Sequence, residues 1–416
     1  MPHVLLAVGA IALLLAVNAR WPRFGPVSAV PSFFAGWWTI ELAPHLLVLE
    51  IAALAALALG GGLATWPGWI GLALGAAGAA GTLATILVSR RTLVTLRESG
   101  VPLDLDPSGA PRYPRSHLVL PPLCLLPRRG VRVDRGVVYR EDGRLRLRLD
   151  VYRPAADGTL RPGLLQIHGG AWIVGDKREQ GLPLLNHLAT QGWVGFNVNY
   201  RLSPRATWPD PLHDLKHFIA WYREHAPDYG ADPDFLCVTG GSAGGHLAAL
   251  VALTANEPRH QPGFEDVDTS VRGAVPFYGV YNFVDAGPWP VPFGAVKFVQ
   301  RMVFKTSFRE NPEPFADASP AKHLRPDAPP FLVVHGTHDS LIPVAEARRF
   351  VTALREASDA PVLYAEMRGG QHAFDVFPSY RTARVVEAVE RYLTGLHRAY
   401  AAGREPARAE DIADLG

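Results

Sequence analysis

The residues of this chain that are most clearly suited to catalysis surround a serine. Gly240-Gly241-Ser242-Ala243-Gly244-Gly245 follows a short apolar run at 235–239 and precedes a run of helix formers at 246–250. This order of strand, turn and helix is the setting of the G-x-S-x-G motif, in which a sharp turn exposes the serine Oγ. Glycine neighbours let such a turn close because they lack Cβ. The pattern predicts that Ser242 is a nucleophile, although the motif alone also arises by chance in glycine-rich loops.

A second glycine-rich segment, His168-Gly169-Gly170-Ala171-Trp172, directly follows the apolar run at 164–167. In the fold that the serine motif implies, a second oxyanion donor comes from the loop at this position. Small residues there let backbone N–H groups approach a substrate carbonyl and bind its developing negative charge. An ordinary glycine turn is the alternative, and it is the better explanation only when the segment is considered without the serine motif.

An acid and a base are expected later in the chain, in the order serine, acid, histidine. Asp339 and His372 each lie a few residues beyond a short apolar run. Catalytic groups gather at the carboxyl ends of strands in open α/β sheets. We therefore predict that Asp339 and His372 complete a catalytic triad with Ser242.

Four other residues compete for these two roles. His246 lies one helical turn after the serine, and a side chain at that offset stacks along the helix instead of crossing the cleft. His335 and His338 precede the acid and would break the expected order, so we expect them to hydrogen-bond loop backbone. Asp375 closely follows the predicted base, and neighbouring loop residues seldom face one another as an orienting pair.

Short apolar runs alternate with helical stretches between residues 131 and 400. This alternation is typical of a mostly parallel sheet covered by helices on both faces. The runs at 137–139 and 145–152 are expected to form an opening antiparallel pair. Further buried strands are expected at 164–167, 194–199, 235–239, 273–277, 331–334 and 362–366. Residues 287–290 and 293–304 are too long for a plain connection, and we interpret them as a lid.

Taken together, these motifs resemble those of the bacterial hormone-sensitive-lipase-like branch of the α/β-hydrolases, which are esterases acting on carboxylic esters. The resemblance covers about residues 131–400 and rests on HGGAW, NYRLSP, GGSAGGH, GTHDSLIP and GGQHAFD. It implies an α/β-hydrolase fold and oxyanion amides from Gly170, Ala171 and Ala243, with Gly169 shaping the loop. Ala171 replaces the last glycine of the common HGGG, and its methyl group is expected to narrow the acyl site.

The reaction implied by this resemblance is hydrolysis of a small-molecule or lipid ester through an acyl-enzyme, with neither a metal nor an organic cofactor. Amide or peptide hydrolysis, as in arylformamidases and acylpeptidases with similar elbows, is a second possibility. A non-catalytic binding module on the same fold is a third, because fold and function can separate. No predicted triad residue is missing, which favours catalysis over binding alone.

The composition excludes several other classes of function. Basic and acidic residues nearly balance, with 41 against 39, so no broad basic face is available for nucleic acid. Cys124 and Cys237 are the only cysteines and lie far apart, which excludes a cysteine-rich metal site or a disulfide framework. The sequence decides neither whether these two cysteines pair nor the oligomeric state. Hydrophobic residues make up 48% of the chain and charged residues only 19%, which indicates a part that is not a soluble domain.

The apolar excess is concentrated in the amino-terminal part of the chain. Residues 66–88 carry no formal charge and are long enough to cross a hydrocarbon core of about 30 Å. Residues 46–63 are equally apolar except for Glu50, whose cost of about 2.5–3.5 kcal/mol the surrounding aliphatic residues can offset. Residues 4–17 are shorter, and we interpret them as an uncleaved span because no Lys or Arg precedes them. A signal peptide cleaved near Ala19 is the alternative.

The chain is expected to comprise a three-span membrane anchor at 1–97, a linker or arm at 98–130, an α/β-hydrolase domain at 131–400 and a tail at 401–416. Arginines follow the first and third spans, whereas the connection between the second and third carries no charge. By the positive-inside rule, both arginine groups and the hydrolase domain face the cytoplasm, and the amino terminus lies outside. The arginines in question are Arg20, Arg23, Arg90, Arg91 and Arg97.

This orientation can be tested by adding protease to right-side-out cells. Residues beyond Arg97 should stay intact, because the arginine groups retain that part of the chain in the cytoplasm. Immunoblotting for the hydrolase domain measures the result, and detergent-permeabilised cells provide the positive control for digestion. Digestion of the hydrolase domain while the membranes remain sealed would refute the orientation.

Overall fold

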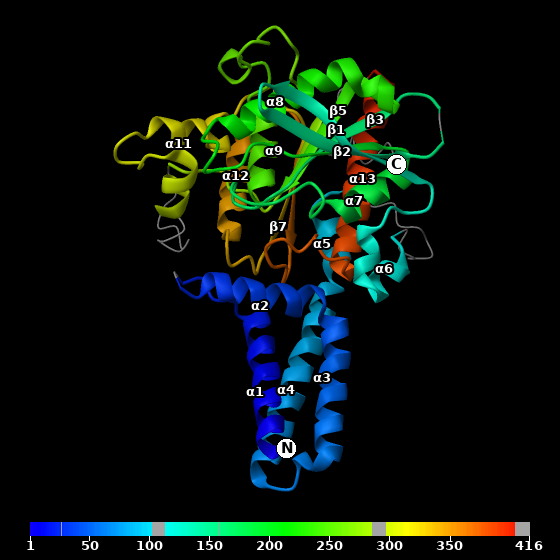
Figure 1. Ribbon diagram of the computed structural model, residues 1–416, viewed down its shortest axis with the longest axis vertical. Helices are drawn as coiled ribbons and strands as arrows, with labels where there is room; N and C mark the ends of the chain where they lie inside the picture. The colour runs from blue at the N-terminus through cyan, green and yellow to red at the C-terminus, as the bar shows by residue number, and fades with distance from the viewer. Residues whose placement is uncertain (26, 102–112, 157, 285–296, 404–416) are drawn as a thin grey trace.

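A single eight-stranded sheet carries the loops on which the predicted site residues lie. The computed structural model describes residues 1–25, 27–101, 113–156, 158–284 and 297–403 (Figure 1). The order of strands across the sheet is β1-β2-β4-β3-β5-β6-β7-β8. The strands are β1 (Val131–Asp142), β2 (Leu145–Pro154), β3 (Arg161–Ile167), β4 (Val194–Val198), β5 (Ala231–Gly241), β6 (Gly273–Phe277), β7 (Phe331–Gly336) and β8 (Val362–Met367).

The pairing of these strands confirms the predicted sheet. β1 and β2 are antiparallel, as are β2 and β4, and every other neighbouring pair is parallel. β5 begins earlier than the expected start at residue 235, because Ala231 pairs with Arg161 at the beginning of β3. The parallel order brings the carboxyl ends of β3, β5, β7 and β8 to one edge of the sheet.

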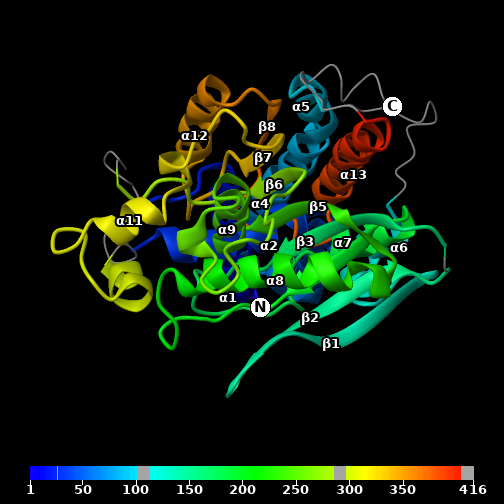
Figure 2. The same ribbon diagram turned by 90° about the horizontal axis from the view of Figure 1, so that it is seen from above.

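Helices cover both faces of the sheet, as the sequence predicts (Figure 2). On one face, α8 (Asp210–His225), α9 (Ala243–Leu253) and α12 (Val344–Ala357) contribute to one apolar core. On the other face, the core is built with residues of α5 (Thr92–Glu98), α7 (Leu182–Thr190) and α13 (Tyr380–Ala401). Both cores are rich in aliphatic strand residues, which is expected of a parallel sheet buried on its two faces.

Several short helices connect these elements. They are α6 (Arg115–Val119), η2 (Pro121–Leu125), η3 (Ala226–Tyr229), η4 (Pro258–His260), η5 (Gln300–Phe304), α11 (Glu313–Asp317) and η6 (Pro320–Lys322). The predicted arm therefore contains the helical turns α6 and η2 in its described part. It also contacts the α/β body, because the Tyr113 amide donates to Glu387 of α13 at 3.0 Å. Residues 287–290 and 293–296 of the predicted lid, residues 102–112 of the arm and the tail beyond residue 403 lie outside the described residues.

Three apolar helices project as a bundle from one end of the α/β body (Figure 1). They are α1 (Pro2–Arg20), α3 (Ala43–Leu57) continued by η1 (Ala58–Gly62), and α4 (Trp66–Ser89), and by length and composition they could cross a membrane. α1 and α4 approach closely, since a Cβ added at Gly71 would lie 2.5 Å from the backbone of Leu5. Glu50 is buried against α4, where its Oε1 accepts a hydrogen bond of 3.3 Å from Thr82.

No pattern in the sequence predicted α2 (Ala29–Glu41), which lies between the first two of these helices in the chain. This helix crosses the end of the bundle beside the α/β body (Figure 1). The amino terminus lies at the far end of the bundle, whereas α1 and α4 both end beside the α/β body. Both arginine groups follow those helix ends and therefore lie on the same side as the sheet. Cys124 and Cys237 are buried and do not pair.

Candidate active site

Ser242 lies on a sharp turn between β5 and α9. Its φ of 59° and ψ of −121° are unusual for a residue with a Cβ. The Ser242 amide donates to the Phe277 carbonyl at 3.0 Å, which fixes the turn against β6. Gly241 is required by close packing, because a Cβ there would lie 2.6 Å from the Tyr278 hydroxyl. The strained turn and its glycine neighbour agree with the geometry that the sequence motif predicts.

Ser242, His372 and Asp339 form one hydrogen-bonded chain. His372 Nε2 lies 2.8 Å from Ser242 Oγ, and His372 Nδ1 lies 2.7 Å from Asp339 Oδ2. The three residues come from the carboxyl ends of β5, β8 and β7, which the sheet places along one edge. Such an arrangement allows the imidazole to accept the serine proton while the carboxylate orients the ring.

The Asp339 carboxylate is buried and fully hydrogen-bonded. Its Oδ1 accepts from the amides of Leu341 at 2.9 Å and Ile342 at 2.7 Å. Burial alone would raise the pKa of this carboxyl group, but the charge of His372 and hydrogen bonds from His335 and His372 outweigh burial and hold the pKa below its usual range. Asp339 is therefore ionised at neutral pH, as an acid that stabilises an imidazolium must be.

The loop carrying His372 is tied to the loop carrying Asp339 by a buried amide side chain. Gln371 Oε1 accepts from the backbone N–H of Ser340 at 2.8 Å and from that of His372 at 2.9 Å. One oxygen atom thus joins two loops that come from different strands. Sequence reasoning did not identify Gln371, although its place directly before the predicted base was a signal that could have been used.

The segment at 168–172 folds back onto the serine turn. Gly169 is required there, since a Cβ would lie 2.6 Å from the Gly241 carbonyl and 3.1 Å from Ser242 Cβ. The Gly169 amide donates to Gln180 Oε1 at 2.7 Å. Gly170 and Ala171 follow with φ values of 114° and 52°, so the loop turns sharply beside Ser242.

The motif at 199–204 supports this loop from behind. The Tyr200 ring stacks on His168, with centroids 4.5 Å apart, and its hydroxyl donates to the His168 carbonyl at 2.9 Å. The Ser203 amide donates to the Trp172 carbonyl at 2.9 Å. Through these contacts, residues 199–204 hold the glycine-rich loop in place.

The rival residues all have other partners. His246 accepts from the Trp172 indole at 3.1 Å, so its other ring nitrogen donates to the Ala318 carbonyl at 2.6 Å. Burial lowers the pKa of His246 to about 4, and the side chain is neutral. Asp375 is also buried, which raises its pKa, and its Oδ1 accepts from the Tyr278 hydroxyl.

The other two histidines contact backbone carbonyls, with one departure from expectation. His335 Nε2 lies 2.9 Å from the Ile342 carbonyl but also 3.2 Å from Asp339 Oδ2, a contact that sequence reasoning missed. His338 Nδ1 lies 2.9 Å from the carbonyl of Ala19. The prediction of a partner in loop backbone is wrong for His338, because its partner is the last turn of α1.

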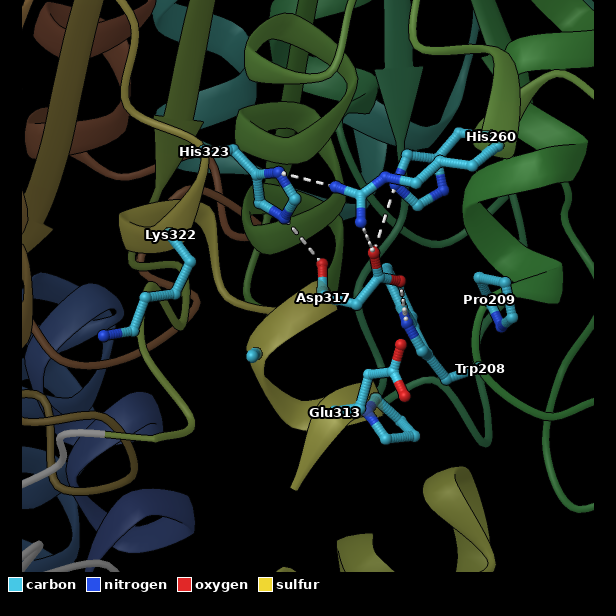
Figure 3. Close-up of a pocket in the computed structure, with 10 residues that line it drawn as sticks. Trp208, Pro209, His260, Glu313, Asp317, Lys322 and His323 are labelled. Carbon is cyan, nitrogen blue, oxygen red and sulfur yellow. Dashed lines mark hydrogen bonds and ion pairs between the residues drawn. The ribbon is translucent and has the colours of Figure 1, made fainter. Parts of the chain in front are cut away.

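A separate cavity of about 500 Å³ lies among the start of α8, η4, α11 and η6 (Figure 3). Asp317 is the centre of its polar network, accepting from the Trp208 indole at 2.7 Å and pairing with Arg259 at 3.2 Å and His260 at 3.3 Å. None of the predicted site residues lines this cavity. Its charged groups are largely paired with one another, so we interpret the network as structural.

The known proteins that this chain resembles include several ester hydrolases. The BD-FAE family model matches residues 149–354. The "Probable carboxylic ester hydrolase LipM" of Mycobacterium tuberculosis (strain ATCC 25618 / H37Rv) is 49% identical over 281 residues, which cover 67% of this chain and 65% of that protein. "Esterase LipC" of the same organism is 41% identical over 283 residues, covering 68% of this chain and 70% of LipC. The match thus spans slightly less than two thirds of LipM.

Solved structures show the same fold. An esterase from the Planctomycetes species Thermogutta terrifontis, Est2, solved with butyrate bound, is 25% identical with a TM-score of 0.54 and covers 64% of this chain and 94% of its own. A truncated carbohydrate esterase from gut microbiota is 23% identical, also with a TM-score of 0.54, and covers 64% of this chain and 96% of its own.

The environment of Asp339 predicts how stability depends on pH. A carboxyl group whose pKa is lowered in the folded state stabilises the fold above the unfolded pKa of about 3.9, and this contribution is lost as the pH falls below that value. As the pH falls below about 4, the melting temperature of wild type should therefore fall more than that of Asp339→Asn. Differential scanning fluorimetry in one detergent from pH 7 to pH 3 measures it. A difference that stays constant over this range would contradict the lowered pKa.

Proposed function

The chain belongs to the hormone-sensitive-lipase-like α/β-hydrolases that include the mycobacterial esterases LipM and LipC, and we propose that it is a membrane-anchored serine esterase. The observation that carries the proposal is the hydrogen-bonded chain from Ser242 through His372 to Asp339. The names of the relatives support a carboxylic ester as the bond that is hydrolysed.

In the proposed mechanism, His372 Nε2 takes the proton of Ser242 Oγ as that oxygen attacks the ester carbonyl. Asp339 holds the proton on Nδ1, which fixes the imidazole tautomer, and stabilises the charge of the imidazolium. The imidazolium then gives its proton to the departing alcohol, which leaves an acyl group on Ser242. Water, activated by the same imidazole, hydrolyses this acyl-enzyme and restores the serine. The mechanism uses neither a metal nor an organic cofactor.

The oxyanion of the tetrahedral intermediate is assigned to the amides of Gly170, Ala171 and Ala243. Ala243 begins α9 directly after the nucleophile, where free amides at a helix start favour negative charge. The sharp turn at Gly170 and Ala171 beside Ser242 supports their assignment. Gly169 shapes the loop, and its own amide is engaged by Gln180.

The three apolar helices are proposed to span the membrane and to leave the hydrolase domain in the cytoplasm. The arrangement of the helix ends supports this, because both arginine groups follow helices that end beside the α/β body. Retention of α1 is supported by its packing on α4 and by the contact of the Ala19 carbonyl with His338. Lipid ester substrates dissolved in the membrane would then be within reach of the enzyme.

The triad is tested by substitution of its members. Ser242→Ala and His372→Ala should each lower kcat for p-nitrophenyl butyrate by roughly 10⁴- to 10⁶-fold, because the nucleophile and base act as a unit. Asp339→Asn should retain somewhat more activity, since the nucleophile and base are still present. Steady-state kinetics of the full chain in detergent provide the measurement.

The matched controls for this experiment are His246→Ala, His338→Ala and Asp375→Asn. Each removes a rival whose partners lie elsewhere, so folded protein should keep substantial activity. Asp375→Asn proving as damaging as His372→Ala in folded protein would overturn the choice of acid.

The acyl preference is tested with p-nitrophenyl esters of increasing chain length. We expect kcat/KM to be higher for C4 to C8 esters than for C16, because we expect the Ala171 methyl group to narrow the acyl site. The esterase solved with butyrate bound is 25% identical to this chain and supports a short acyl group. One peptide and one formamide substrate, assayed beside the esters, test amide hydrolysis. A C16 ester with the highest kcat/KM would refute the preference.

A further inference from the structure

The helix between the first two spans contacts the loop that carries His372. Two faces of α2 have different surroundings: one contacts the α/β body and the other is exposed. Phe33, Trp37 and Glu41 follow one another at four-residue spacing and contact the α/β body, with Phe33 and Glu41 only 8% and 3% exposed. The neighbouring positions Phe34 and Trp38 are 53% and 56% exposed. Only the first face contacts His372 and the Ala373 carbonyl directly.

The most direct contact is a hydrogen bond from α2 to the backbone next to the base. The Trp37 indole N–H donates to the carbonyl of Ala373 at 2.8 Å. Ala373 directly follows His372 and has a φ of 55°, a left-handed conformation that residues with a Cβ seldom adopt. A backbone in such a conformation persists only when its surroundings hold it there. The Trp37 hydrogen bond is one such restraint, and it acts one residue away from the imidazole.

Aromatic packing extends the same contact to the imidazole itself. The Phe33 ring meets the His372 ring edge-on, with centroids 5.9 Å apart and planes at 76°. Trp37 stacks on Phe33 at 5.5 Å and packs against Phe377 of the His372 loop at 4.5 Å. The His372 ring therefore has α2 on one side and Ser242 and Asp339 at its two nitrogens.

Both ends of α2 are fixed to the α/β body. At its carboxyl end, the buried Glu41 carboxylate pairs with Arg381 and accepts from the Ser379 hydroxyl at 2.7 Å. At its amino end, the Ala29 carbonyl accepts from Ser340 in the Asp339 loop at 3.2 Å. Because α2 bridges the loop of the acid and the loop of the base, a change in its position would reach both.

From these contacts we propose that Trp37 is a positioning residue for the active site. Its indole N–H holds the Ala373 carbonyl and thereby keeps His372 in line between Ser242 Oγ and Asp339. The amino-terminal region then positions an active-site residue in addition to anchoring the enzyme. This inference rests on the proposed esterase function.

The test compares Trp37→Phe with Trp38→Phe in the full chain, reconstituted in lipid nanodiscs. Phenylalanine keeps an aromatic ring against Phe377 and removes the N–H. Trp38 is the matched control, because it packs on the same Phe377 ring at 5.6 Å from the exposed side of α2. Active sites are titrated with a fluorophosphonate, so that kcat for p-nitrophenyl butyrate refers to intact sites only.

We expect Trp37→Phe to lower kcat per titrated site by about tenfold, since small displacements of a catalytic group have effects of this order or larger. KM should stay within about twofold, and the rate of fluorophosphonate labelling should fall in parallel with kcat, because both depend on His372. Trp38→Phe should match wild type. Replacement of Trp37 by 3-benzothienylalanine, which keeps the ring shape and has no N–H, should reproduce the loss.

Wild-type kcat per site in both Trp37 variants would overturn the proposal, as would an equal loss in Trp38→Phe or a loss confined to KM. The benzothienylalanine variant decides the matter if Trp37→Phe does not fold, because it preserves the packing. Ser242→Ala is assayed alongside. Absence of ester hydrolysis by wild type, or wild-type activity in Ser242→Ala, would contradict the esterase function itself and not the role of Trp37.

Discussion

The hydrogen-bonded chain from Asp339 through His372 to Ser242 requires three loops from β7, β8 and β5 to meet within hydrogen-bonding distance. A parallel sheet satisfies this requirement because it brings the carboxyl ends of its strands to one edge. The loops must then be held against the strain of the turn at Ser242 and of the left-handed residues beside it. Gln371 contributes to this, since its single side-chain oxygen joins the Asp339 loop to the His372 loop.

The same edge of the sheet faces the helical bundle, so the candidate active site contacts the amino-terminal helices. His338, Ser340 and Ala373 all hydrogen-bond to residues between 19 and 37. Helices that served only to tether the proposed enzyme to a membrane would not need to contact the Asp339 and His372 loops. These hydrogen bonds also place the proposed site close to the end of the bundle. Under the proposed anchoring, an ester dissolved in the membrane would be presented there.

The parts of this fold that could be predicted are those encoded by neighbours in sequence. Short apolar runs identified every strand. The glycines around Ser242, set between such a run and a run of helix formers, indicated the sharp turn. Asp339 and His372 followed from chain order and from their positions after strands. The contacts of α2 could not be found in this way, because the Ser340 contact joins residues 311 positions apart. Residues 29–41 lie between two apolar runs, and their helix is recognisable only once Phe33 and Trp37 have a surface to pack on.

The central claim is that Ser242 is activated by His372 and lies beside oxyanion donors. A fluorophosphonate probe tests it most directly, because it reacts with a serine that has an activating base and amides for the phosphoryl oxygen. Mass spectrometry of the labelled, folded protein should place the modification on the peptide carrying Ser242, and Ser242→Ala should abolish labelling. Folded wild-type protein that resists the probe, or labelling that maps to another residue, would contradict the account.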